Sequence, residues 1–173
     1  MSLETSLGGC LAYIGKRKKE KGKRNEGVVK FKQISFRSEW YGQACELRNE
    51  LLRKPLGLDL FTEDLAAESG YRHFGMIEEN RVVACALAIP VTPEKAKIRQ
   101  MTVALEYQRQ GVGRQLLRNM ELDLKQQGIE SLELEARSTA VGFYEKLGYI
   151  TEGNEFLVVS IPHKRMVKSL VQE

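Results

Sequence analysis

The apolar and polar positions of this chain follow two periods, one typical of strands and one typical of helices. Residues 28–35, VVKFKQIS, alternate apolar residues with lysines, which favours a half-buried strand. Residues 40–53 predict a helix with one apolar face. That face would carry Ala44, Leu47, Leu51 and Leu52. We expect the helix to end at Pro55, because proline lacks a backbone donor and cannot continue it.

A second, short helix is expected over residues 62–70, with Thr62 as its N-cap and Gly70 as its end. Two strands follow, with the sequences HFGMIEE and RVVACALAIPV. A tight turn through Glu79 and Asn80 would join them. The next run, IRQMTVAL, adds a third strand and completes an antiparallel meander.

The second half of the chain repeats the change between helical and extended periods. Residues 113–128 predict a helix that Gly128 closes, with one apolar stripe. The stripe consists of Leu116, Leu117, Met120 and Leu124. After it, SLELEA is typical of a strand and TAVGFYEKLGY of a short helix, and residues 149–171 predict a final hairpin. The pattern indicates an α/β fold with an antiparallel first half and a strand–helix–strand unit.

Length and charge divide the chain into two parts. A chain of 173 residues with 42% hydrophobic content can bury one sizeable core, so we expect one domain over residues 28–173. Residues 1–27 hold seven basic and three acidic residues, which leaves 20 of each in the remainder. The basic run KRKKEKGKR therefore belongs to an N-terminal extension. It is either solvated or contacts an anionic surface, and the neutral remainder argues against a nucleic-acid-binding protein.

Cysteine usage and hydropathy indicate the compartment. Cys10, Cys45 and Cys85 are spaced too widely for a metal-binding motif, and His73 and His163 are the two histidines. We expect reduced thiols and no metal site. No apolar run reaches the roughly 20 residues that a membrane-spanning helix needs. The sequence thus predicts a cytoplasmic protein without a membrane partner.

Residues 107–117, YQRQGVGRQLL, place two glycines immediately before a helix. Missing side chains let backbone N–H groups approach a ligand, and the N-terminus of a helix favours an anion, so a phosphate is the expected ligand. A Walker A loop is excluded because no Gly-Lys pair follows. The dinucleotide fingerprint is disfavoured because Leu116 stands where its third glycine belongs. The remaining pattern is Q/R-x-x-G-x-G/A over residues 108–113.

This pattern carries a family resemblance. The stretch QMTVALEYQRQGVGRQLL, followed by ARSTAVGFYEKLGY, resembles the GCN5-related N-acetyltransferase superfamily over roughly Val28 to Leu170. The stretches LRNELLRKPLG and SIPHKRMVK resemble a bacterial branch of it. The resemblance implies a mixed, mostly antiparallel central sheet of six to seven strands with helices on both faces. It also implies transfer of an acetyl group from acetyl-CoA to a primary amine of a small molecule or protein, without a metal.

The resemblance further implies the residues that bind acetyl-CoA. Backbone amides of the turn would hold the pyrophosphate, through Gln108, Arg109, Gln110, Gly111, Val112, Gly113 and Arg114. Backbone groups of Met101 and Val103 would hold the acetyl and pantetheine parts, and Ala140 and Phe143 would flank the cofactor tail. Ser138 stands where the family commonly has an asparagine that bonds the pantetheine arm.

Catalytic roles follow from the same resemblance. Tyr144 of FYEKLGY matches the tyrosine that protonates the leaving thiolate, and the N–H of Val103 is the candidate oxyanion donor. The acidic base that some members carry on the fourth strand is absent from AKIRQMTV, so His163 is the candidate general base. Three residues of the first helix would contribute either to the acceptor site or to a solvated face. They are Glu46, Arg48 and Arg53.

Two alternatives stay open. One is a module that binds acetyl-CoA without catalysis, against which Tyr144 argues. The other is a nucleic-acid-associated protein that acts through its basic extension. A homodimer is compatible with the sequence.

Overall fold

The computed structural model describes residues 28–171. The basic run of the extension and Cys10 lie outside these residues. The described chain forms one sheet of seven strands in the order β1-β2-β3-β4-β5-β7-β6, in which neighbours are antiparallel except for the parallel pair β4 and β5. The strands are β1 (Lys30–Ile34), β2 (Arg72–Glu78), β3 (Arg81–Thr92), β4 (Lys95–Val103), β5 (Ser131–Arg137), β6 (Ile150–Val158) and β7 (Ile161–Ser169).

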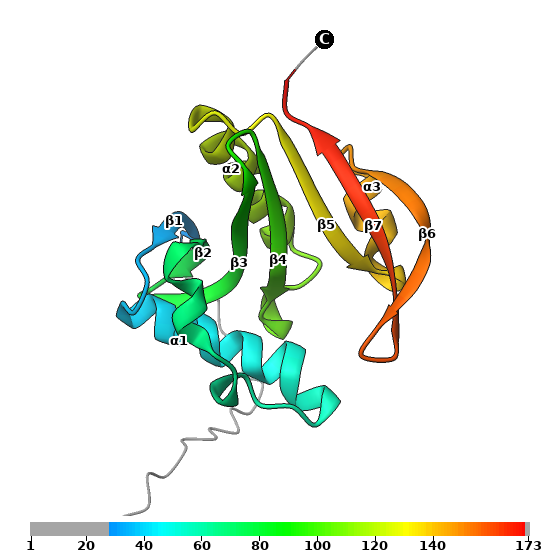
Figure 1. Cartoon of the computed structure of the whole chain (residues 1–173). Helices are drawn as coiled ribbons and strands as arrows, with labels where there is room; N and C mark the ends of the chain where they lie inside the picture. Colours follow the sequence, from blue (N-terminus) through cyan, green and yellow to red (C-terminus); the bar gives the residue numbers. More distant parts are fainter. Residues whose placement is uncertain (1–27, 172–173) are drawn as a thin grey trace, which may run out of the picture.

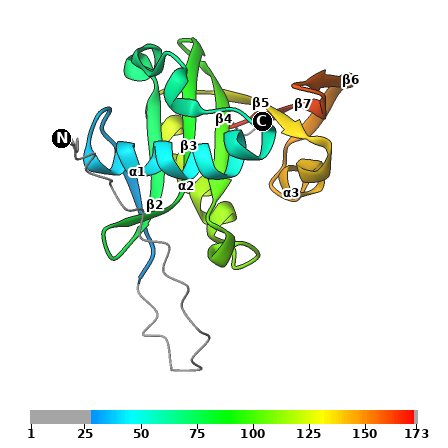
Figure 2. The ribbon, with the colours of Figure 1, turned by 90° about the horizontal axis from the view of Figure 1, so that it is seen from below.

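Three α-helices accompany the sheet: α1 (Glu39–Arg48), α2 (Val112–Gln126) and α3 (Val141–Glu145). The helical segment that follows α1 and the N-terminal turn of α2 lie on opposite sides of the strands (Figure 2). The predicted fold class, a mixed and mostly antiparallel sheet with helices on both faces, is confirmed. The meander and the strand–helix–strand unit are present as expected, because β2, β3 and β4 pair in sequence and α2 connects β4 to β5.

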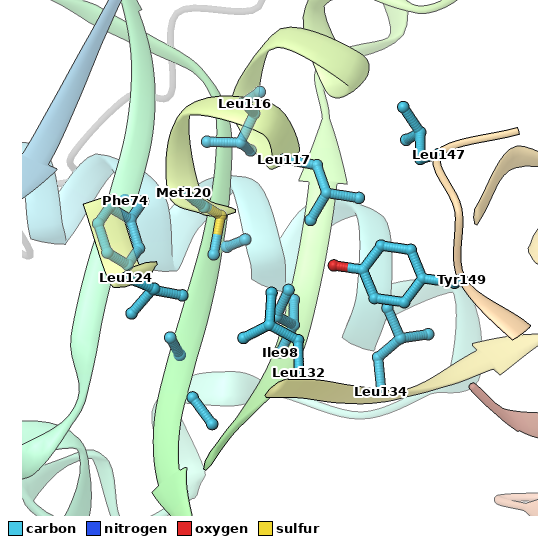
Figure 3. Close-up of a cluster of buried hydrophobic side chains, with 14 of the residues drawn as sticks. Phe74, Ile98, Leu116, Leu117, Met120, Leu124, Leu132, Leu134, Leu147 and Tyr149 are labelled. Atoms are coloured by element: carbon cyan, nitrogen blue, oxygen red, sulfur yellow. The ribbon is translucent and has the colours of Figure 1, made fainter. Parts of the chain in front are cut away.

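Each face of the sheet has its own core. On one face, Leu116, Leu117, Met120 and Leu124 of α2 are at most 1% exposed and pack on inward residues of β2 to β5 (Figure 3). Full burial of such a side chain contributes about 1.5–3 kcal/mol, so this stripe anchors α2 to the sheet. On the other face, a smaller cluster joins α1 to β1, β2 and β3. The alternation of strand residues between the two clusters determines which side chains reach which face.

The first predicted helix is shorter than expected. The α-helix ends at Arg48, and residues Asn49–Arg53 widen into a π-helical turn before a 3₁₀ turn at Lys54–Leu56. The buried Asn49 side chain accepts a hydrogen bond from the N–H of Leu60 at 2.8 Å. This contact ties the π-helical turn to the segment that follows it, and Leu51 and Leu52 of the predicted apolar face are only partly buried.

The second predicted helix is also different. It consists of two 3₁₀ segments, Leu60–Thr62 and Leu65–Gly70. The prediction of Thr62 as the N-cap was wrong, because its hydroxyl donates to the backbone oxygen of Asp59 at 2.8 Å. Asp64 caps the second segment instead, since its carboxylate accepts from the N–H of Ala66.

Candidate active site

The sheet opens between its two parallel strands. β4 and β5 pair over Lys95–Ile98 and Ser131–Leu134, and beyond these residues they diverge (Figure 1). Residues 99–103 and 135–137 therefore face each other without ladder hydrogen bonds. Backbone groups along such an opening are available to a ligand.

A β-bulge lies in β4 where it leaves β5. Gln100 has a positive φ of 52°, and the pairing with β3 shifts register between Cys85 and Leu87. As a result, Met101 packs toward α2, as Ile98 does, although regular alternation would place it on the other face. No glycine marks the bulge, so the sequence offered no signal for it.

The bulge is followed by Val103, whose backbone faces the opening. The N–H of Ala104 donates to the carbonyl of Val83 on β3 at 2.8 Å. Because successive residues of a strand direct their N–H groups to opposite edges, the N–H of Val103 points away from β3 and into the opening. The carbonyl of Val103 accepts from Nε2 of Gln108 at 2.9 Å, which ties the strand end to the glycine turn.

The glycine turn leaves several N–H groups at the start of α2. Gly111 has a φ of 85°, a conformation that favours glycine, and precedes the helix. The N–H of Gln115 makes the first helical bond, to the carbonyl of Gly111 at 3.0 Å. The N–H groups of Val112, Gly113 and Arg114 thus have no partner inside the helix and lie at its positive end.

Side chains of the turn divide into two kinds. Gln108 and Gln110 brace the turn, since each side chain donates to a backbone carbonyl, of Val103 and Glu106 respectively. Arg109 and Arg114 are exposed and form no ion pair with any residue between 28 and 171. The turn therefore combines a braced backbone with two available positive charges, which suits a pyrophosphate.

Gly113 brings three elements together. A Cβ placed there would lie 3.3 Å from Cγ2 of Val103, 3.4 Å from Cε of Met101 and 3.7 Å from Cζ of Phe143. The start of α2, the bulged end of β4 and α3 consequently meet around one bare backbone position. Four residues predicted to contact the cofactor are thereby adjacent in space.

Tyr144 of α3 reaches the same place. Its hydroxyl donates to Sδ of Met101 at 3.6 Å, and its ring packs against Phe143 and Tyr149. Burial raises the pKa of Tyr144 to about 12, so the phenol keeps its proton throughout the physiological range. A thioether sulfur is a weak acceptor, and a stronger acceptor can replace it.

Ser138 and Ala140 form the 3₁₀ turn between β5 and α3. The Ser138 hydroxyl donates to a carboxylate oxygen of Glu155 on β6 at 2.6 Å. Its proton is therefore directed to β6, while its oxygen retains acceptor capacity. Ala140 is half-buried immediately before α3.

His163 lies on β7 opposite Arg137 of β5. Its Nδ1 is 2.8 Å from the backbone oxygen of Ile161, and its ring stacks on Phe156. Because a carbonyl can only accept, Nδ1 carries the proton of the neutral ring, and Nε2 is left as an acceptor. The side chain is partly buried, and it lies beside the end of β5 that diverges from β4.

The three residues predicted on the first helix lie in different environments. Glu46 is exposed, and Arg53 pairs with Glu63 at 2.5 Å. Arg48 is 0% exposed, and its guanidinium binds Glu68 through contacts of 2.6 and 3.0 Å. The interpretation of Arg48 as part of a solvated face was wrong, because its charge is neutralised inside the fold.

Sequence reasoning missed the polar groups at the opening of β4 and β5. Oε1 of Gln100 is buried and has no hydrogen-bond partner within residues 28–171. Glu135, the first residue of β5 beyond the paired region, binds Nζ of Lys97 at the edge of the opening at 2.6 Å. Strand alternation alone could have identified Glu135 as outward-facing, but nothing in the sequence places it beside the bulge.

The fold is that of acyl-CoA N-acyltransferases. A crystal structure of a predicted N-acetyltransferase from Lactobacillus plantarum gives a TM-score of 0.74 at 20% identity and covers 83% of this chain and 99% of that one. An aminoglycoside 6'-N-acetyltransferase complexed with coenzyme A gives a TM-score of 0.68 at 15% identity and covers 83% and 98%. At these identities the likeness shows the fold alone.

Sequence comparisons identify the family. Residues 42–170 match the model of the acetyltransferase (GNAT) domain. A predicted acetyltransferase of Bacillus subtilis is 31% identical over 128 residues, which are 72% of this chain and 86% of that protein. The ribosomal protein bS18-alanine N-acetyltransferase of Escherichia coli is 33% identical over 82 residues, which are 46% and 55%. The chain belongs to the GNAT acetyltransferase family.

Among residues 28–171, no helix is long and apolar enough to cross a membrane.

Proposed function

We propose that this protein transfers an acetyl group from acetyl-CoA to a primary amine of a small molecule or a protein. One observation carries the proposal: the N–H groups at the start of α2, the bulged edge of β4 and the Tyr144 hydroxyl converge on Gly113 and Met101. We assign the activity to a single domain over residues 28–173. The family match over residues 42–170 and the one continuous sheet support this assignment.

The residues present fit acetyl-CoA. The N–H groups of Val112, Gly113 and Arg114 would bind its pyrophosphate, and the charges of Arg109 and Arg114 would add to the helix dipole. At Gly113 a side chain would already contact the wall formed by Val103 and Phe143, so bare backbone is needed for close approach. When bound, acetyl-CoA supplies a thioester carbonyl and a thiol leaving group.

Val103 and Tyr144 would act at the thioester. The N–H of Val103 points into the opening, where it would donate to the oxygen that becomes negative as the amine attacks. Tyr144 would donate its proton to the sulfur that departs, exchanging the weak Met101 acceptor for a thiolate. Its raised pKa keeps it a donor up to strongly alkaline pH.

The attacking amine must be neutral and must lose a proton. An exposed lysine-type amine has a pKa near 10.4, so about one molecule in 2,500 is neutral at pH 7. We assign the role of proton acceptor to Nε2 of His163, which is the acceptor nitrogen of the neutral ring when Nδ1 donates to the backbone oxygen of Ile161. Glu46 and Arg53 would border the acceptor side, whereas Arg48 supports the same region from inside.

Calorimetric titration with acetyl-CoA tests the proposal, with NAD and ATP as controls. We expect acetyl-CoA to bind selectively and free thiol to be released when an amine is added. If folded protein does not bind acetyl-CoA, the glycine turn is a structural turn and the proposal is wrong. If it binds but no amine releases thiol, the alternative of a binding module without catalysis is correct.

A further inference from the structure

The side of the opening that faces away from α2 has a distinct composition. Leu132, Leu134 and Ala136 of β5 pack toward α2, so Glu135 and Arg137 point to the opposite side. Arg99 of β4 points there too. Its cross-strand partner Leu87 lies between Ala86 and Ala88, which pack toward α2, so Leu87 faces away from α2. Directly paired residues of neighbouring strands share a face, so Arg99 does the same. We call this side, formed by Arg99, Glu135, Arg137 and His163, the acceptor face.

Two carboxylates beside the acceptor face are already paired with cations. Glu135 pairs with Lys97 at 2.6 Å, and Glu63, on the segment after α1, pairs with Arg53 at 2.5 Å. The nearby Glu155 accepts a hydrogen bond from Ser138. Coulomb attraction from this region toward a further cation is therefore weakened.

The two arginines of the acceptor face differ from these carboxylates. Arg99 is exposed and Arg137 is half-buried, and neither forms an ion pair or a side-chain hydrogen bond with any residue from 28 to 171. They stand on the two strands that diverge, one on each side of the opening. A half-buried guanidinium without an anion is unfavourable, and a bound anion would relieve that cost.

Arg99 lies close enough to the segment after α1 for its charge to act on Glu63 of that segment. The pKa of Glu63 lies below its ordinary value, chiefly because of the hydrogen bond from Arg53 and more weakly because of the charges of Arg48 and Arg99. The acceptor face is thus bordered by this segment on the side of β4 and by the β6–β7 hairpin on the side of β5.

We propose that the acceptor is an amine that also carries an anionic group, a carboxylate or a phosphate, which Arg99 and Arg137 bind while the amine enters the opening. This inference rests on the acetyltransferase function proposed above. Guanidinium groups bind carboxylate and phosphate oxygens in a bidentate geometry, so the two arginines would orient the acceptor as well as attract it. Amines whose other groups are cationic would be repelled from the same face.

Matched acceptors test the inference. The full chain, saturated with acetyl-CoA, is given L-lysine or its decarboxylated counterpart 1,5-diaminopentane, and phosphoethanolamine or ethanolamine, and thiol release is measured. We expect kcat/KM to be about tenfold or more higher for the anionic member of at least one pair, as one charge-assisted hydrogen bond would produce. The pair that responds distinguishes carboxylate from phosphate.

Variants locate the preference. Arg99→Gln and Arg137→Gln should raise the KM for the anionic acceptor and reduce the preference about tenfold, and Arg99→Lys should restore part of it. Acetyl-CoA affinity should stay unchanged in these variants. Arg118→Gln, which replaces an exposed arginine on α2, is the matched control and should retain the preference.

Three results would overturn the inference while leaving the acetyltransferase function intact. One is an equal or faster reaction of the counterparts that lack the anionic group, and another is a preference that survives in the Arg99→Gln/Arg137→Gln double variant. The third is failure of all four amines while another amine or a peptide amine releases thiol. Failure of every amine while acetyl-CoA is bound would contradict the acetyl transfer itself. The inference would then fall with it.

Discussion

Tyr144 packs like a core residue, and its hydroxyl is what distinguishes a catalytic from a structural role. Its ring lies 5.0 Å from that of Phe143 and 5.7 Å from that of Tyr149. The Tyr149 hydroxyl is buried without a hydrogen-bond partner within the described residues, whereas the Tyr144 hydroxyl points to Met101 at the opening. The two tyrosines thus form a natural pair for comparison.

Tyr144→Phe should keep acetyl-CoA binding and lower kcat by about 10²–10⁴-fold, because a positioned general acid contributes about that much. The decrease should be largest for acyl donors with poor leaving groups. Single-turnover thiol release and calorimetry measure the two quantities. Tyr149→Phe removes a hydroxyl outside the opening and should leave both quantities unchanged. Equal turnover in wild type and Tyr144→Phe would show that Tyr144 has only a packing role.

Gly111→Asp should abolish acetyl-CoA binding, because it places a negative charge against the pyrophosphate. Gly111 and Gly128 stand before and after α2, at φ values of 85° and 88°, and both have open space around them. Either substitution costs about 1–2 kcal/mol of stability for the left-handed backbone. Gly128→Asp is therefore the control with matched strain, and calorimetry should show that it binds normally. Binding by Gly111→Asp with unchanged affinity would refute the role of the turn.

Among the elements, the end of α1 shows how a buried charge organises a connection. Arg48 binds Glu68 of the 3₁₀ segment Leu65–Gly70, and the Tyr41 hydroxyl donates to the same carboxylate at 2.9 Å. The segment between these two residues borders β4 near the opening. The Glu68 carboxylate thus attaches the segment between α1 and β2 to α1.

Arg48→Met should destabilise the protein by about 3–5 kcal/mol, since it leaves Glu68 buried without its counter-charge. The double variant Arg48→Met/Glu68→Gln should recover more than half of this loss. Urea unfolding of each variant gives the free energies. Lys54→Met, which breaks the exposed pair with Glu50, should cost less than about 1 kcal/mol. A small loss for Arg48→Met would show that water reaches the pair.

His73, on β2, predicts a dependence of stability on pH. Burial lowers the pKa of His73 below its ordinary value of 6.5, and its Nε2 lies 3.0 Å from the backbone oxygen of Glu68. As pH falls below about 6.5 the unfolded chain binds a proton that the folded chain does not, so the stability decreases until the folded pKa is passed. Urea unfolding between pH 7 and about 5 should show this decrease.

The variant His73→Gln should lose that part of the pH dependence, because glutamine does not titrate. The window lies above the ordinary pKa of carboxylates, so their protonation contributes little to it. An unchanged slope in the variant would assign the dependence to another group.

At the scale of the whole molecule, we expect that removal of residues 1–27 leaves acetyl-CoA affinity and thiol release unchanged. Every described residue assigned to the cofactor or to catalysis lies between Met101 and His163, and the seven-stranded sheet begins at Lys30. Calorimetry and the thiol assay on the shortened chain provide the measurement. A loss of acetyl transfer would place an essential part of the site in the extension, and a loss of nucleic-acid binding would support the alternative function.

The order and type of most elements could be predicted from the sequence, since hydrophobic periodicity is local and survives in most of the strands and in α2. The glycine turn was predictable for the same reason, because Gly111 and Gly113 precede an apolar stripe that has helical spacing. The error at Arg48 occurred where a side chain binds a partner 20 residues away, and the error at Thr62 occurred where a hydroxyl donates to a backbone carbonyl of its own turn. Propensity carries no information about such partners.

Sequence was therefore sufficient for the family and for a glycine turn at the start of α2, because both depend on residue types at short, regular spacing. The phosphate-binding role of that turn and the role of Tyr144 as an acid stay predictions. Three features required the folded chain: the bulge at Gln100, the burial of Arg48 against Glu68, and the placement of Arg99 and Arg137 on two diverging strands. Each of these depends on contacts or register between residues that lie at least 20 positions apart or on different strands. Such contacts form when the sheet assembles, and no local pattern specifies them.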